Sequence, residues 1–239
     1  MKGRIIEIFS SIQGEGLWVG RPQIFVRFHG CRLACSFCDT PLTHKDIHEA
    51  RIEYPPFSRK FERRSLEFTL EELNEVFRRF PVTSLAITGG EPLEQSEFLS
   101  SWLPTVAGDY SILLETNGVE TEAMEKILPW VSIVSLDLKV PSATNEGGFW
   151  KLHDQFLDAV SQKPHYAKIV YDERMTEEEG EEVIKIARRH PSLELVFQPV
   201  SPLQKRDLRR CLSIFQKISE KFPARVRFIP QVHKFLSIL

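Results

Sequence analysis

Apolar residues fall in short, nearly continuous runs along most of the chain, and segments with apolar residues at helical spacing lie between the runs. The runs are rich in Ile, Val, Leu and Phe, which is typical of strands covered on both faces. They predict strands at residues 23–28, 84–88, 111–115, 132–138, 166–171, 194–198 and 225–229.

Helix signals fall between these strands. Thr69 with Glu72, and Thr176 with Glu179, each form a capping box that is followed by apolar residues at helical spacing. Cys211 lies in a further helical segment and fits a small buried hydrophobe. The apolar stripe of that segment, within residues 203–222, consists of Leu208, Leu212, Phe215 and Ile218. We expect these stripes to face the core.

Strands that alternate with helices predict an α/β fold with a parallel sheet. The chain has 239 residues, and two long loops are expected at residues 31–65 and 141–150. A closed eight-unit barrel typically needs ~250 residues or more. We therefore predict an open, partial (βα)6-type parallel barrel that forms a single domain over residues 1–239. Loop 31–65 is inserted after the first barrel strand, and ligands should gather at the C-terminal strand ends.

Composition limits the partners. Apolar residues make up 42 % of the chain and charged residues 27 %, and the net charge of -2 gives no sign of a nucleic-acid partner. The apolar run at residues 5–9 is too short for a signal peptide, and no run approaches the length of a membrane span. We expect a cytoplasmic protein with no membrane partner.

Three of the four cysteines, Cys31, Cys35 and Cys38, lie within eight residues directly after the first predicted strand. Cysteines this close are poor disulfide partners for each other but suit one metal centre. Three thiolates can hold three irons of a cubane cluster and leave the fourth iron open to a substrate or cofactor. From the cysteines alone, a zinc site with His29 or His44 as fourth ligand remains an alternative.

Polar groups follow four successive predicted strands. A Thr-Gly-Gly-Glu-Pro turn at residues 88–92 ends one strand, and its glycines let a backbone approach a ligand closely. Residues 115–118 end the next strand, and Asp137 with Lys139, then Gln198, end later ones. Each of these fits ordinary turn chemistry when taken alone. Their recurrence at four strand ends favours a binding site.

The cysteine spacing and the turn at residues 88–92 together resemble the radical S-adenosylmethionine superfamily. There, three cysteines carry a 4Fe-4S cluster whose open iron chelates S-adenosylmethionine, and an electron from the cluster yields a 5′-deoxyadenosyl radical. The resemblance implies that the cluster ligands are Cys31, Cys35 and Cys38. Together with the strand-end groups, it implies S-adenosylmethionine contacts at Phe37, Asp39, Gly90, Glu91, Asp137, Lys139 and Gln198.

Further motifs resemble the 7-carboxy-7-deazaguanine synthases of the queuosine and archaeosine pathway. They lie at residues 7–16, 20–22, 25–27, 38–40, 88–93, 115–118 and 231–235. In that family, a radical removes hydrogen from C6 of 6-carboxy-5,6,7,8-tetrahydropterin, the ring contracts and ammonia leaves. A magnesium ion assists the reaction. We expect an electron donor of flavodoxin or ferredoxin type to reduce the cluster, and we expect a homodimer.

The resemblance also implies which residues meet the substrate. They are Ile12, Gln13, Gly14, Glu15, Arg27, Thr88, His233 and Leu239, and Thr40 would ligate magnesium. Arg27 offers a planar fork for the substrate carboxylate, and magnesium prefers hard oxygen ligands. Arg32 departs from the family, where we expect Asn.

Two other functions remain open. A glycyl-radical enzyme activase shares the cysteine spacing and the Gly-Gly-Glu-Pro turn, but it would not need Gln13, Glu15 and Arg27 arranged for a pterin. A non-enzymatic zinc or iron–sulfur binding module would need the cysteines alone.

Overall fold

The computed structural model describes residues 1–144, 147–201 and 205–238. Its strands are β1 (Gly3–Ile12), β2 (Pro22–Phe28), β3 (Glu49–Glu53), β4 (Phe61–Ser65), β5 (Glu67–Phe68), β6 (Ser84–Gly89), β7 (Ser111–Thr116), β8 (Ile133–Asp137), β9 (His165–Tyr171), β10 (Glu194–Pro199) and β11 (Val226–Phe228). Its α-helices are α1 (Leu70–Phe77), α2 (Ser96–Trp102), α3 (Thr121–Ile127), α4 (Pro141–Thr144), α5 (Trp150–Val160), α6 (Glu177–Arg189), α7 (Lys205–Ser219) and α8 (Val232–Leu236).

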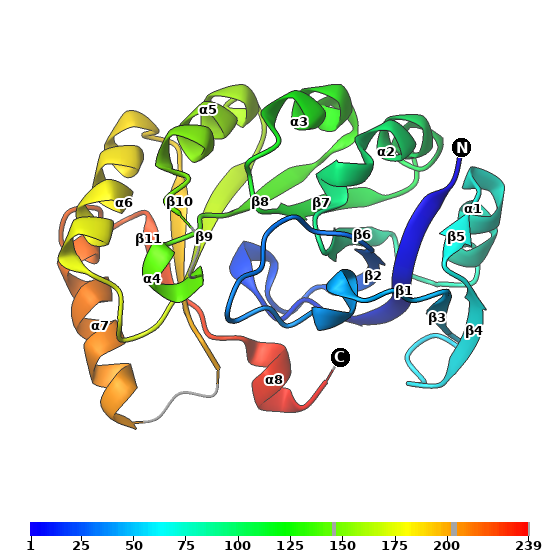
Figure 1. The fold of residues 1–239 in the computed structure, drawn as a ribbon, viewed down its shortest axis with the longest axis horizontal. Coiled ribbons are helices and arrows are strands. Elements are labelled where there is room, and N and C mark those ends of the chain that lie inside the picture. Colours follow the sequence, from blue (N-terminus) through cyan, green and yellow to red (C-terminus); the bar gives the residue numbers. More distant parts are fainter. Residues whose placement is uncertain (145–146, 202–204, 239) are drawn as a thin grey trace.

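The described strands form one sheet in the order β11-β10-β9-β8-β7-β6-β2-β1-β3-β4, with β5 paired to β1. From β2 through β6 to β11, neighbouring strands are parallel. The sheet curves but does not close, because β11 and β4 remain its two edges (Figure 1). The prediction of an open, partial parallel barrel is confirmed.

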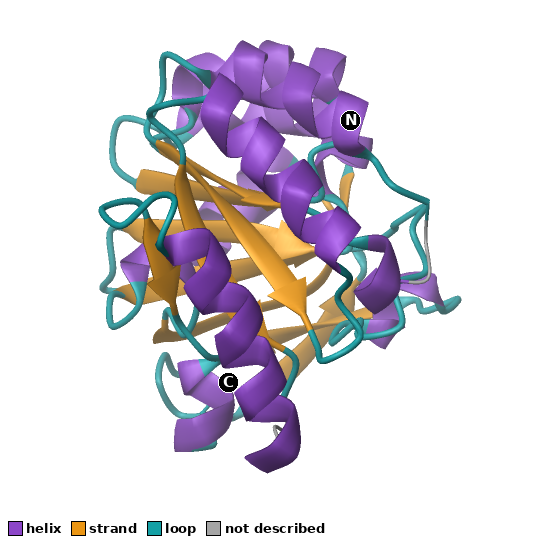
Figure 2. Cartoon of the chain, turned by 90° about the vertical axis from the view of Figure 1, so that its left-hand side faces the viewer, coloured by secondary structure: helices purple, strands orange, loops and turns teal. Residues whose placement is uncertain are grey.

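Helices α2, α3, α5, α6 and α7 lie on the outer side of the curved sheet, and the strands enclose the inner side (Figure 1 and Figure 2). Side chains alternate between the two faces along each strand. In β6, Leu85 and Ile87 belong to the large core under the helices, whereas Ala86 belongs to a smaller inner cluster. That inner cluster takes one buried member from each of seven strands: Phe9, Phe25, Ala86, Leu113, Ile133, Tyr166 and Val196.

All seven predicted strands are present, with ends shifted by at most two residues. Both predicted capping boxes are formed, at Thr69 and at Thr176. Cys211 is fully buried, as expected. The expectation for Leu212 was wrong, because its side chain is 41 % exposed and the neighbouring Cys211 occupies the inward position on α7 instead.

Two parts of the sheet were not predicted. β1 pairs antiparallel with β2, and its apolar pattern is interrupted by Glu7, Ser10 and Ser11. The expectation of a loop at residues 31–65 was wrong for its second half, which contains the β3–β4 hairpin. This hairpin is rich in charged residues, as edge strands commonly are. Residues 141–150 likewise begin with α4 rather than with a loop.

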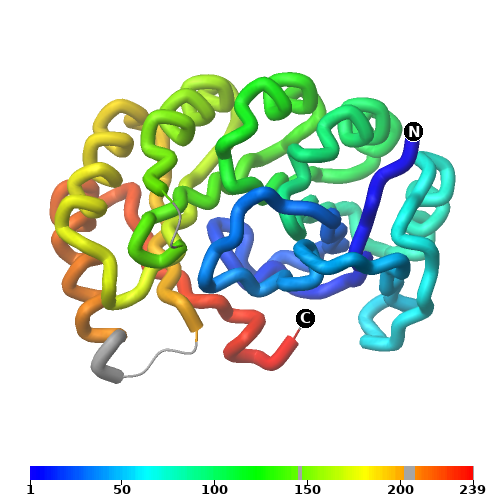
Figure 3. Tube along the Cα trace, viewed as in Figure 1, coloured from blue at the N-terminus to red at the C-terminus, as the bar shows by residue number. Residues whose placement is uncertain are grey.

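The C-terminal segment crosses the open side of the barrel and returns to the N-terminal strand (Figure 3). The Val232 amide donates a hydrogen bond to the Gly14 carbonyl at 2.9 Å, and Arg59 Nη2 donates to the Ser237 carbonyl at 2.7 Å. Segments from the two ends of the sequence therefore meet over the inner face. None of the described helices combines the length and apolarity needed to cross a membrane.

Candidate active site

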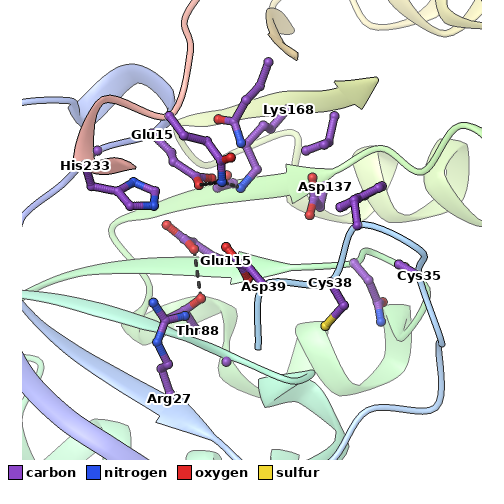
Figure 4. A pocket seen from close by; sticks show the side chains of 18 of the residues that line it. Glu15, Arg27, Cys35, Cys38, Asp39, Thr88, Glu115, Asp137, Lys168 and His233 are labelled. Atoms are coloured by element: carbon purple, nitrogen blue, oxygen red, sulfur yellow. Dashed lines mark hydrogen bonds and ion pairs between the residues drawn. The ribbon is translucent and has the colours of Figure 1, made fainter. Parts of the chain in front are cut away.

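A large cavity opens on the inner face, at the C-terminal ends of the parallel strands. The cavity is open to solvent on one side, and its empty space counted out to the mouth is about 1270 Å³. The ends of β2 and β6 to β10 line it, together with the cysteine loop and the C-terminal segment. Side chains from all of these elements point into the same space (Figure 4).

Cys31, Cys35 and Cys38 all line this cavity. Burial raises the pKa of the Cys31 thiol to about 11, so this sulfur stays protonated until a bound metal displaces its proton. Among the described residues, Glu15, Asp39 and His233 form a group whose possible metal-binding atoms all lie within 4.8 Å of one another. The three cysteines do not form such a group.

A single zinc ion needs its ligand atoms close together, with zinc–sulfur bonds of about 2.3 Å. The cysteine thiols are not gathered in this way, and His29 Nε2 lies 2.9 Å from the Lys45 carbonyl. His44 is exposed. The described residues therefore do not form a compact zinc site around the cysteines.

Beside the cysteines, the cavity offers acceptors with no donor. Asp137 Oδ1 and Gln198 Oε1 are buried and have no hydrogen-bond partner. Lys139 Nζ lies 2.7 Å from Asp137 Oδ2 and 5.1 Å from the centre of the Phe37 ring. Acceptors beside an aromatic ring suit a ligand that carries hydroxyl or ammonium donors and a flat base. The residues present therefore fit a cubane cluster with S-adenosylmethionine.

Glu91 does not line the cavity, although the sequence suggested it as a ligand contact. Its carboxylate is fully buried and accepts hydrogen bonds from the Leu93 amide at 3.0 Å, the Thr116 hydroxyl at 2.8 Å and the Asn117 amide at 2.7 Å. Burial raises the pKa of this carboxyl group to about 7. Glu91 thus ties the end of β6 to the end of β7, while Gly90 faces the cavity.

A network of polar side chains forms the opposite part of the cavity. Gln13 Nε2 donates to Gln23 Oε1 and to Glu115 Oε1, each at 3.0 Å, and Gln13 Oε1 accepts from the Glu15 amide at 3.0 Å. The Thr88 hydroxyl donates to Glu115 Oε2 at 2.8 Å. Burial is the main cause that raises the pKa of Glu115, and the nearby Glu15 adds to it.

Glu15 forms a buried ion pair with Lys168, with Oε2 and Nζ 2.5 Å apart. Gln231 Nε2 donates to the other carboxylate oxygen at 2.8 Å. Burial alone would raise the pKa of Glu15, but the Lys168 ammonium and these hydrogen bonds outweigh it and lower the pKa well below the ordinary value. The carboxylate is therefore ionised inside the cavity.

Arg27 points into the cavity from β2. Its Nε donates to Glu7 Oε1 at 2.9 Å, its Nη1 donates to Thr40 Oγ1 at 3.3 Å, and its guanidinium lies 5.5 Å from the centre of the Phe9 ring. Thr40 is buried beside the cavity rather than in its lining, and its hydroxyl donates to Asp39 Oδ1 at 3.2 Å. Thr40 and Asp39 together offer the hard oxygens that suit magnesium.

The remaining predicted substrate contacts lie at the mouth. Ile12, Gly14 and His233 all line the cavity. A Cβ atom at Gly14 would lie 2.3 Å from His233 Nδ1, so the close approach of the C-terminal segment requires glycine at position 14. Leu239 lies outside the described residues.

Among the cavity residues that the sequence analysis did not name as site residues are Glu115, Lys168 and Gln231. Glu115 stood in a recognised motif but was explained as part of a turn. Lys168 is flanked by apolar residues in a strand that is buried throughout, and a lone charge there is a usable signal, because lysine is almost never fully buried without a partner. Gln231 begins the motif at residues 231–235, from which only His233 was taken as a substrate contact.

Comparisons with known proteins agree with this geometry. The model of the Radical SAM superfamily matches residues 25–189, more than half of the chain. A 7-carboxy-7-deazaguanine synthase of Geobacter sulfurreducens is 34 % identical over 98 % of this chain and 96 % of its own length. The synthase of Methanothermobacter thermautotrophicus is 32 % identical over 100 % of this chain and 98 % of its own length.

Two solved structures share the fold. QueE from Escherichia coli superposes with a TM-score of 0.68 at 23 % identity, covering 98 % of this chain and 95 % of that one. TYW1 with a lysine-pyruvate adduct bound superposes with a TM-score of 0.55 at 15 % identity, covering 83 % of this chain and 73 % of that one.

The buried ion pair yields a stability prediction. Lys168→Met leaves Glu15 buried without its counter-charge, which we expect to lower the free energy of unfolding by about 3 kcal/mol at neutral pH. In the variant, burial raises the folded-state pKa of Glu15, so stability should be retained at low pH and lost as the pH rises through that pKa. Urea unfolding at several pH values measures both effects.

The matched control for this variant is Lys168→Met combined with Glu15→Gln, which removes both charges. It should recover most of the lost stability and show no such pH dependence. Equal stability of the two variants at all pH values would contradict the assigned ion pair.

The Gly-Gly-Glu-Pro turn yields a second prediction. A Cβ atom at Gly90 would lie 1.9 Å from the Gly30 carbonyl oxygen and 2.1 Å from Thr43 Oγ1, both in the cysteine loop. We expect Gly90→Ala to displace that loop and to lower the iron bound per chain to less than about half after anaerobic reconstitution. Gly108→Ala is the control, because nothing lies within 4 Å of its Cβ position. Unchanged iron in Gly90→Ala would refute the close packing.

Proposed function

The chain belongs to the 7-carboxy-7-deazaguanine synthase family of the radical SAM superfamily, and from this we propose that it converts 6-carboxy-5,6,7,8-tetrahydropterin to 7-carboxy-7-deazaguanine with loss of ammonia. The chain is thus a radical SAM enzyme of 7-deazapurine biosynthesis. The observation that carries the substrate proposal is the cavity itself. It has three cysteines at one side and an Arg27, Glu15 and Glu115 constellation at the other.

Cys31, Cys35 and Cys38 would hold the 4Fe-4S cluster, and S-adenosylmethionine would lie between the cluster and the strand ends. When bound, the cluster supplies the electron that cleaves S-adenosylmethionine and starts the radical chemistry. Asp137 and Gln198 are the acceptors in this part of the cavity that have an oxygen without a donor. Phe37, held against Lys139, offers its ring to the adenine.

The other part of the cavity suits a pterin with a carboxylate. The aminopyrimidinone edge of a pterin carries N–H donors. The Glu15 and Glu115 carboxyl groups can accept from them in the part of the cavity opposite the cysteines. Gln13 donates to the Glu115 carboxyl group and accepts from the backbone amide of Glu15, so its side chain ties Glu115 to the main chain at Glu15. Arg27 would take the substrate carboxylate, for which its planar fork is the natural partner.

The C-terminal segment would cover the bound substrate. His233 lines the mouth, and burial lowers its pKa, so its imidazole is neutral at physiological pH and can accept or donate one hydrogen bond. Closure of this side would exclude water from the reacting ring. Leu239 stays a substrate contact that only the family resemblance implies.

Magnesium is proposed at Thr40, with Asp39 as a neighbouring oxygen. Arg27 donates to the same Thr40 oxygen at 3.3 Å, which places the proposed metal site and the carboxylate-binding guanidinium side by side. A substrate carboxylate shared between Arg27 and magnesium would satisfy both.

The finer points of partnership belong to the same proposal. We expect a flavodoxin- or ferredoxin-type donor to reduce the cluster, a homodimer in solution, and a cytoplasmic location. The activase alternative finds no support in the relatives, which carry the synthase name along their full length. A non-enzymatic binding module would need the cysteines alone and would have no use for the polar residues around Glu15 and Glu115 that line the cavity.

A product assay tests the proposal directly. Anaerobically purified protein should carry about four irons per chain. With reductant, S-adenosylmethionine, Mg²⁺ and 6-carboxy-5,6,7,8-tetrahydropterin, it should form 7-carboxy-7-deazaguanine, detected by mass spectrometry. Cys38→Ala should lose the cluster and the product together. A colourless zinc protein, or deoxyadenosine formed only with a large protein partner, would refute the proposal.

Arg27→Ala tests the carboxylate contact separately. A charged hydrogen bond is worth about 1.5–3 kcal/mol, so the KM for the pterin should rise by roughly 10- to 100-fold. Iron content should stay unchanged, because Arg27 touches no cysteine. Arg21→Ala is the matched control, since Arg21 is exposed, lies over the Trp18 ring and does not line the cavity. Loss of the cluster in Arg27→Ala would show that its role is structural.

A further inference from the structure

The β3–β4 hairpin brings a second arginine toward the carboxylate-binding side of the cavity. Glu7 on β1 is the cross-strand partner of Arg27 on β2, and it is also the partner of Arg51 on β3. Arg27 is in turn aligned with Thr88 on β6. Four adjacent strands thus place Arg51, Glu7, Arg27 and Thr88 in one row.

Contacts within this row are direct. Arg51 Nη2 donates to Glu7 Oε2 at 2.5 Å, and Arg27 Nε donates to Glu7 Oε1 at 2.9 Å. One carboxylate therefore holds both guanidinium groups, one on each oxygen. The Glu7 side chain is only 12 % exposed, so water screens its contact with the largely buried Arg27 poorly, whereas the Arg51 side chain is about half exposed.

An aromatic ring packs against the guanidinium group of each of the two arginines. The Arg51 guanidinium lies 4.7 Å from the centre of the Phe61 ring, which comes from β4. The Arg27 guanidinium lies 5.5 Å from the Phe9 ring, which is stacked on Phe25 at 5.1 Å. Both contacts restrict the rotamers of long side chains.

We propose that Arg51 is a positioning residue for substrate recognition, which acts through Glu7 to aim Arg27 at the substrate carboxylate. This inference rests on the proposed function and gives the β3–β4 hairpin a role in it. Arg51 itself does not line the cavity, and neither does Glu7, so both act through Arg27.

Charge and geometry both support this role. Two guanidinium groups and one carboxylate give the row one net positive charge. Without Arg51, the Glu7 carboxylate would face Arg27 alone and neutralise it, which would weaken the attraction for an incoming anion. Glu7 occupies the Nε side of Arg27, so the Nη groups stay turned toward the cavity and Thr40.

The test compares Arg51→Gln with Arg63→Gln in the cluster-loaded protein. Arg63 lies opposite Arg51 on the same hairpin and forms an exposed ion pair with Glu49 at 2.8 Å. The ligands are 6-carboxy-5,6,7,8-tetrahydropterin and its carboxamide, which has the same ring but no negative charge. Dissociation constants for both ligands and the KM and kcat of the reaction are measured.

We expect Arg51→Gln to weaken binding of the carboxylate ligand roughly tenfold and to raise KM by the same factor, with little change in kcat. Binding of the carboxamide should be unchanged. Arg51→Lys keeps the charge and should recover part of the loss, and Arg63→Gln should change neither ligand by more than about twofold. In an Arg27→Lys background, Arg51→Gln should have no further effect on the preference for the carboxylate.

Other results would overturn the inference. If Arg51→Gln weakens both ligands equally, the residue is merely structural, and if it weakens neither, Glu7 does not transmit its influence. If the parent protein forms product while Arg51→Gln behaves like it in every assay, only this inference fails. If the parent protein forms no product from the pterin, the proposed function fails and this inference fails with it.

Discussion

The buried ion pair between Glu15 and Lys168 is the interaction on which the architecture of the cavity depends. Glu15 follows β1, Lys168 lies on β9 on the other side of the open barrel, and Gln231 joins them from the C-terminal segment. Two charges are costly to bury unless each satisfies the other. Their pairing holds three distant segments in one place and keeps an ionised acceptor facing the cavity.

The alternation of side chains along parallel strands explains how the rest of the site is built. Each strand sends one residue to the helices and the next to the inner face, so six parallel strands, together with Phe9 of β1, form an inner cluster of apolar side chains. Two positions beyond that cluster, the same faces carry polar groups. Ala86 is followed inward by Thr88, and Leu113 by Glu115. The inner apolar cluster therefore packs directly beneath the polar residues that line the cavity.

The sequence predicted the parallel strands well because both of their faces are buried, which leaves an unbroken apolar run. It also located the cysteine loop and the Gly-Gly-Glu-Pro turn, because both are local patterns. It missed β1, where Glu7 and Ser10 break the apolar run, and the β3–β4 hairpin, whose charged side chains resemble those of a solvated loop. Glu7 pairs with arginines and Ser10 with Glu53, and such partners 20 to 44 residues away leave no periodic signal.

The same limit explains why the motif residue Glu91 does not line the cavity while Glu115 does. Glu91 follows the end of β6 and Glu115 is the penultimate residue of β7, and nothing in their local sequence shows in which direction each side chain points. The Glu91 side chain points into the protein rather than into the cavity, because the Thr116 hydroxyl and the Asn117 amide at the end of β7 donate hydrogen bonds to its carboxylate there. Glu115 turns to the cavity because Thr88 and Gln13 offer donors on that side. The direction of each carboxylate is set by the groups that donate hydrogen bonds to it. Because those donors come together only when the sheet forms, the tertiary structure and not the local sequence decides which of the two glutamates lines the cavity.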